Sequence, residues 1–77
     1  MRLQANQQPL HRTLLGQRIR KHRLRRKMTQ ETAAEAAMLD AKYFGEVERG
    51  ETTISIDRLV NIATALETTV RELTRDF

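Results

Sequence analysis

Apolar residues recur at helical spacing in the first third of the chain. Leu15, Ile19 and His22 fall on one stripe, and basic residues occupy many of the other positions around it. This periodicity predicts a helix from about Arg12 to Arg26. Pro9 is an alternative start, because proline is favoured in the first turn of a helix.

Residues with a strong preference for helix N-caps precede the next two predicted helices. Thr29 is placed to cap a helix from Gln30 to about Ala37. Asp40 is placed to cap a shorter helix, which Gly50 ends. Because so few residues separate these two helices, the sequence predicts a very tight turn between them.

The last third of the chain predicts two further helices. Ser55 begins a helix with one buried stripe made of Leu59, Ile62, Ala63 and Leu66. Thr69 and Glu72 form a capping-box pattern that opens a helix with Val70, Leu73 and Phe77 on one side. Since no segment alternates as a strand does, we expect an all-α fold of five short helices.

Charge is distributed unevenly along the chain. Nine basic residues and no acidic residue precede Glu31, whereas five basic and ten acidic residues follow from Glu31 onward, giving a net charge of +4. A basic region of this kind suggests a polyanionic partner, nucleic acid ahead of an anionic membrane surface. A solvated basic helix is the alternative interpretation.

Composition excludes several classes of protein. The 77 residues are 39% hydrophobic, which suits one small domain without a deep catalytic cavity. With no cysteine there is neither a disulfide framework nor a thiolate metal site, so a cytoplasmic location is expected. No apolar run approaches the roughly 18 residues of a membrane span. The glutamine-rich residues 1–11 lack the apolar block of a signal peptide and are expected to form a flexible arm.

The second and third predicted helices have the geometry of a DNA-reading pair. Two short helices joined by a tight turn can place the second, polar-faced helix in the major groove. Ala34 is small where the two helices are expected to cross. A packed pair of helices with no role in DNA binding is the alternative.

A characteristic set of residues recurs in order at matching spacing: Gly16-Gln17-Arg18-Ile19, Arg23, Thr29-Gln30-Glu31, Ala34, Leu39-Asp40, Phe44, Val47-Glu48-Arg49-Gly50, Ser55, Leu59, Ile62-Ala63-Thr64-Ala65-Leu66 and Glu72-Leu73. In these residues the chain from Leu15 to Leu73 resembles the Cro and phage-repressor type of helix-turn-helix domain, the XRE family. Within that family, a stretch around Tyr43 is similar to the controller proteins of restriction-modification systems.

The resemblance implies a lambda-repressor-like five-helix bundle over residues 12–77 that combines DNA binding with dimerisation. It also implies a transcriptional regulator that binds a palindromic operator in double-stranded DNA as a homodimer. An antitoxin-type module, whose main partner is another protein, is the alternative function. No enzyme, metal site, cofactor or small-molecule ligand is expected.

Residues expected to contact DNA follow from the same resemblance: Thr29, Gln30, Ala41, Lys42, Tyr43, Gly45, Glu46, Arg49 and Thr52. Lys42 suits guanine or a phosphate, Tyr43 a thymine methyl or a phosphate, and Glu46 cytosine. Gln30 matches the family glutamine that clamps a phosphate and braces the recognition helix. Arg49 is expected to face the phosphate backbone.

Several positions depart from the family pattern. Met38 stands where the helix-turn-helix turn usually has glycine, and we expect it to fold inward and fill the space that Ala33 leaves. Lys27 likewise replaces a glycine, and His22 replaces an apolar residue. At Ala41, controller proteins often present a long basic side chain, so the operator sequence does not carry over.

Two further expectations concern the assembly of the domain. Arg23 and Glu48 are charges on otherwise apolar stripes, at family positions that pair, and are predicted to form a buried or half-buried ion pair. The surplus of apolar residues near the end of the chain predicts a homodimer interface in the fourth and fifth helices, formed by Leu66, Val70, Leu73 and Phe77.

Overall fold

The computed structural model describes residues 9–77, and over this range the chain forms five helices and no strand. They are α1 (Leu10–Arg25), α2 (Gln30–Ala36), α3 (Ala41–Glu48), α4 (Ile56–Ala65) and α5 (Val70–Leu73). The all-α prediction is confirmed. Most of the predicted arm lies outside the described residues, and α1 begins at Leu10, directly after Pro9, two residues earlier than the main prediction.

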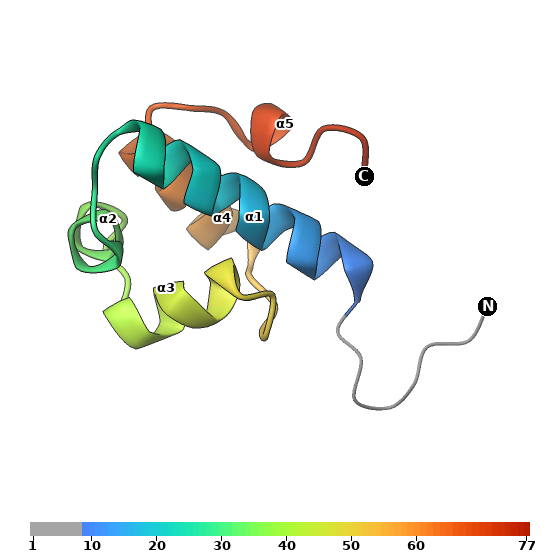
Figure 1. Ribbon diagram of the computed structural model, residues 1–77, viewed down its shortest axis with the longest axis horizontal. Coiled ribbons are helices and arrows are strands. Elements are labelled where there is room, and N and C mark those ends of the chain that lie inside the picture. The colour runs from blue at the N-terminus through green and yellow to red at the C-terminus, as the bar shows by residue number, and fades with distance from the viewer. Residues whose placement is uncertain (1–8) are drawn as a thin grey trace.

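The helices surround one small core. In Figure 1, α1 crosses the molecule with α4 behind it, α3 below it and α5 above it. The most extensive contacts are those of α1 with α3 and α5, of α2 with α3 and α4, and of α4 with α5. The largest fully buried side chains are Phe44, Ile19, Ile62, Leu66 and Leu73. These five side chains come from α1, α3, α4 and α5 and, in the case of Leu66, from the residue that follows α4.

Local sequence signals account for the starts of four helices. The side chains of Thr29, Asp40, Ser55 and Thr69 each accept a hydrogen bond from a backbone N–H in the first turn of the helix that follows. These bonds satisfy donors that have no partner inside the helix. All four predicted N-caps are confirmed.

The ends of α1, α2 and α4 share an unusual feature. Lys27, Met38 and Glu67 follow these helices with φ of 57°, 60° and 55°, in the left-handed region where glycine is common. After α2, Met38 N–H donates to Glu35 O and Leu39 N–H to Ala34 O, which caps the last carbonyls. The left-handed turn therefore forms without glycine.

Met38 does not fill the core. Its side chain is 80% exposed, so the expectation that it folds inward is wrong. Ala33 is fully buried together with Ala34 and Ala37, which shows that α2 approaches its neighbours closely enough to need no larger side chain. The space expected beside Ala33 is removed by this close approach.

Candidate nucleic-acid interface

The third helix has one buried and one exposed face. Asp40 Oδ2 accepts hydrogen bonds from the N–H groups of Lys42 and Tyr43 at 3.0 and 3.2 Å, which fixes the start of α3. Phe44 and Val47 are buried on the inner face, whereas Lys42 is exposed and Glu46 is partly exposed. The outer face of α3 is therefore available to a partner.

Glu48 anchors the end of α3 to two other helices. Arg23 of α1 donates from Nε to Glu48 Oε2 at 2.6 Å and from Nη2 to Glu48 Oε1 at 3.1 Å. The two side chains are only 9% and 2% exposed, so this ion pair is almost fully desolvated. A third Arg23 nitrogen donates to Met28 O at 2.9 Å, which ties the turn after α1 to the same group.

Gln30 joins the same network from the first turn of α2. Its Nε2 donates to Glu48 Oε1 at 3.0 Å, and its Oε1 lies 3.3 Å from the position where a side chain on Gly45 would begin. Gln30 therefore braces α3 directly. An amide nitrogen carries two N–H groups, so the second remains for another acceptor.

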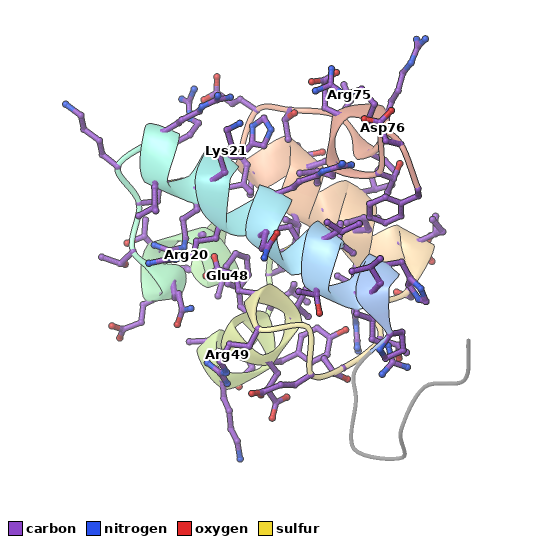
Figure 2. All side chains as sticks on the ribbon, turned by 45° about the vertical axis from the view of Figure 1, so that its right-hand side comes forward. Arg20, Lys21, Glu48, Arg49, Arg75 and Asp76 are labelled. Carbon is purple, nitrogen blue, oxygen red and sulfur yellow. The ribbon has the colours of Figure 1, made fainter. Side chains whose placement is uncertain are left out.

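Glu48, the last residue of α3, and Arg49, which follows it, point to different sides of the helix. Figure 2 shows Glu48 between α1 and α3, whereas Arg49 lies on the side of α3 away from α1. Arg49 Nε donates to Glu51 Oε2 at 3.0 Å, and this hydrogen bond raises the pKa of Arg49. Arg49 therefore carries its charge on the outer surface beside α3.

Tyr43 folds back onto the loop between α3 and α4. Its hydroxyl donates to Thr53 O at 3.0 Å, and the guanidinium carbon of Arg58 lies 5.1 Å from the centroid of its ring. Arg58 was not among the residues expected at the interface. Sequence alone offers little to find it, because the pairing joins two helices through tertiary packing.

The other residues expected to contact DNA are placed around this surface with separate roles. Thr29 Oγ1 caps α2 by accepting from Thr32 N–H at 3.0 Å. Ala41 packs partly against the hydrophobic core, and Gly45 is buried beneath Arg49 and Gln30. Thr52 is half-buried on the loop after α3.

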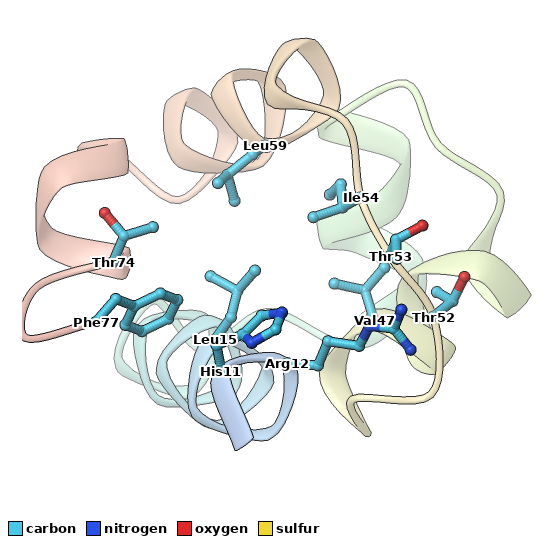
Figure 3. Close-up of a pocket in the computed structure, with 10 residues that line it drawn as sticks. All are labelled: His11, Arg12, Leu15, Val47, Thr52, Thr53, Ile54, Leu59, Thr74 and Phe77. Carbon is cyan, nitrogen blue, oxygen red and sulfur yellow. The ribbon is translucent and has the colours of Figure 1, made fainter. Parts of the chain in front are cut away.

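A cavity of about 240 Å³ opens on a different part of the molecule (Figure 3). It lies between the start of α1, the loop after α3, α4 and the chain end, and its lining includes Arg12, Thr52 and Phe77. Arg12 Nε is buried there without a hydrogen-bond partner. Since Lys42, Tyr43 and Glu46 do not line it, the cavity is separate from the outer face of α3.

Two of the four residues predicted to form a dimer interface are part of the monomer core. Leu66 and Leu73 are 1% and 0% exposed, so a second copy cannot reach them and this part of the expectation is wrong. Val70 is half-buried, and the exposed ring of Phe77 lies beneath Arg18, whose guanidinium carbon is 5.2 Å from the ring centroid. The small fifth helix uses Leu73 to close the core.

His22 lies half-buried on α1, at a position where the family pattern has an apolar residue. Burial lowers the pKa of His22, and the neighbouring positive charges of Arg25 and Lys21 lower it further, while Glu72 opposes them. The neutral imidazole is therefore favoured in the folded protein.

None of the helices within residues 9–77 combines the length with the apolar character that a membrane span requires. The same range contains no group of three or more histidine, cysteine, aspartate or glutamate residues arranged to hold a metal ion.

Comparison with known proteins gives matches across most of the chain. The helix-turn-helix family model HTH_3 matches residues 19–73. Control protein C.SmaI of Serratia marcescens is 35% identical over 60 residues, which cover 78% of this chain and 71% of that protein.

Two solved structures are also similar to this chain over most of its length. The restriction-modification controller protein C.AhdI from Aeromonas hydrophila has a TM-score of 0.82 at 38% identity, covering 84% of this chain and 98% of that one. The clp gene regulator ClgR from Corynebacterium glutamicum has a TM-score of 0.83 at 30% identity, covering 90% and 88% of the two chains.

Proposed function

Because the chain belongs to the HTH_3 family of helix-turn-helix DNA-binding transcriptional regulators, we propose that it binds a palindromic operator as a homodimer, with α3 in the major groove. The observation that carries this proposal is the network around Glu48, which fixes α3 to α1 and α2 while leaving its outer face exposed. A reading helix held in this way keeps its side chains in register with the base edges.

The residues of this surface divide into two roles. Lys42, Tyr43 and Glu46 face the bases, with Lys42 suited to guanine and Glu46 to cytosine. Four further residues contact or approach the phosphate backbone and set the register on the duplex: Thr29, Gln30, Arg49 and Thr52. One N–H of the Gln30 amide donates to Glu48, and its second N–H serves a phosphate oxygen of the DNA. Ala41 adds only a methyl group at the start of α3, and Gly45 leaves room for the side chains of Arg49 and Gln30.

Basic residues outside α3 add attraction without reading sequence. In Figure 2, Arg20 and Lys21 lie on different sides of α1, so the positive charge surrounds this helix and only part of it faces a duplex. Interaction with phosphates releases counterions and weakens with salt.

The direct test of DNA binding is a titration with two fluorescent duplexes. One is selected by the purified chain from a pool of randomised sequences, and the other has the same composition in scrambled order. We expect tighter binding to the selected duplex, by about 10³-fold or more, and affinities for both that fall steeply with salt. Equal affinity for the two duplexes would refute sequence-specific binding.

The dimer is assigned to the outer face of α4 in place of the buried leucines. Ile56 and Val60 are 66% and 46% exposed and lie one turn apart on the same side of this helix. Together they form an apolar face that a second copy would cover. A twofold pair places the two reading helices about 34 Å apart, on successive major grooves.

Sedimentation at micromolar concentration tests the dimer. We expect Val60→Glu to produce a monomer with weakened operator binding. Leu24→Glu is the matched control, because Leu24 is an exposed apolar residue on α1. A parent protein that sediments as a monomer would remove the dimer from the proposal.

The likeness to C.SmaI and C.AhdI favours a controller of a restriction-modification system as the specific role. Such a gene is expected beside genes for a DNA methyltransferase and an endonuclease. Inspection of the genomic neighbours tests this role. A neighbouring gene whose product forms a stable complex with this chain would instead support the antitoxin function.

A further inference from the structure

The ring of Tyr43 is held by contacts from two separate segments. Its hydroxyl donates to Thr53 O in the loop after α3, and Arg58 in the first turn of α4 places its guanidinium over the ring. A partly exposed tyrosine with fewer contacts could adopt more than one rotamer. Here the hydroxyl contact fixes one end of the side chain and the guanidinium contact covers a face.

Arg58 is well suited to hold an aromatic ring. A planar guanidinium can stack on an aromatic face, which the compact ammonium group of lysine cannot do. The Arg58 side chain contacts the Tyr43 ring, and it has no hydrogen bond or ion pair with the described residues. Its backbone N–H is committed to the cap residue Ser55, so the base of the side chain is anchored on α4.

The pair lies at the edge of the exposed surface of α3. Tyr43 and Arg58 share a surface hollow with Met38, Leu39 and Asp40, the residues that connect α2 to α3. Tyr43 therefore has contacts to the protein on one side and an open hollow beside it. A nucleotide approaching the start of α3 would meet the ring in the orientation that Arg58 sets.

We infer that Arg58 is a positioning residue for DNA recognition, which holds Tyr43 so that its ring reads one base pair of the operator. This inference rests on the proposed function, and it adds a residue from α4 to the reading surface of α3. Because Arg58 acts by holding the Tyr43 ring in place, it affects discrimination between sequences more than overall affinity.

A double-mutant cycle tests the inference with the duplex selected by the parent protein and a set of duplexes carrying single base-pair changes. We expect Arg58→Gln to reduce discrimination at one base-pair position by about 2- to 5-fold, the scale of an exposed cation–π contact. In a Tyr43→Leu background, Arg58→Gln should change discrimination no further. In a Tyr43→Phe background, which keeps the ring, the effect should persist. Thermal melting of each variant verifies that it is folded.

A different result would overturn the inference. If Arg58→Gln weakens all duplexes equally and lowers the salt slope by about one, Arg58 contacts a phosphate and does not position Tyr43. An undiminished loss of discrimination in the Tyr43→Leu background would also overturn it. Failure of the parent protein to select any duplex is a separate outcome, since it refutes the proposed function itself.

Discussion

Glu48 joins three helices of the domain through one buried carboxylate. Its carboxylate accepts hydrogen bonds from Arg23 on α1 and Gln30 on α2, although its side chain is only 2% exposed. A desolvated charge of this kind is tolerated because its partner and hydrogen bonds replace water. The position of α3 therefore depends on a charge inside the domain.

We expect Glu48→Gln to lower the free energy of unfolding by about 3–5 kcal/mol, because it leaves the Arg23 charge buried without its counter-ion. Urea denaturation followed by circular dichroism measures this change. Glu67→Gln is the matched control: Glu67 pairs with Arg26 at the surface, where the loss should stay below about 1 kcal/mol. Equal stability of Glu48→Gln and the parent would contradict the role of this pair.

His22 gives the domain a pH dependence of definite sign. Because burial lowers its pKa in the folded state, the unfolded chain takes up the proton first as the pH falls below about 6.5. The stabilising contribution is present above that pH and is lost as the pH falls through the folded-state pKa.

Urea denaturation at about pH 7.5 and about pH 5.5, on either side of the unfolded-state pKa, measures this contribution. We expect the parent to lose more stability between these values than His22→Leu does. His11→Leu, which replaces an exposed histidine on the same helix, is the matched control for the substitution itself. Parallel behaviour of the parent and His22→Leu would show that His22 plays no part.

At the scale of elements, the crossing of α1 and α3 depends on Gly16. A Cβ at this position would lie 2.2 Å from the carbonyl oxygen of Glu48 and 2.7 Å from that of Val47. Both are backbone atoms of α3, so the two helices would have to move apart. Only glycine permits this approach, which also brings Arg23 and Glu48 together.

Gly16→Ala should therefore lower the free energy of unfolding by about 1–3 kcal/mol, the usual cost of overpacking. Gly45→Ala is the informative comparison, because its nearest neighbours are the flexible ends of Arg49 and Gln30 at 3.0 and 3.3 Å. There we expect little change in stability, since the better helix propensity of alanine offsets the crowding. Operator affinity should nevertheless fall as Gln30 and Arg49 are displaced. A stable Gly16→Ala variant would contradict the close crossing.

The starts of the helices could be predicted from sequence because they depend on local hydrogen bonds. Thr29, Asp40, Ser55 and Thr69 each cap through their own side chain, and the tight turn after α2 needs only nearby carbonyls. The start of α1 was harder to predict from sequence, because Pro9 permits an earlier start than the apolar stripe indicates.

Burial and side-chain pairing depended on how the helices pack, and sequence predicted them less well. Leu73 was expected at a surface, but the single turn of α5 buries it completely. Met38 was expected inside, but the close approach of α2 leaves no room for it. The pairing of Tyr43 with Arg58 was missed because it joins two helices across the loop after α3.

At the scale of the whole molecule, the domain separates support from contact. The core and the Arg23–Glu48 pair lie on the inner side of α3, whereas Lys42 and Arg49 are exposed. The exposed apolar residues of α4 form a third surface, which we assign to a second copy. Under the proposed function, this arrangement lets a small domain hold α3 rigidly while its outer face meets a duplex.

The assignment of α3 as the reading helix is tested most directly by comparing three variants on selected and scrambled duplexes. Fluorescence anisotropy should show that Lys42→Ala and Glu46→Ala change the ranking of operator sequences, each by about 1–3 kcal/mol at its own base pair. Arg49→Ala should weaken binding to all duplexes about equally, as expected for a phosphate contact. If all three variants lose affinity equally for selected and scrambled DNA, α3 does not read the sequence.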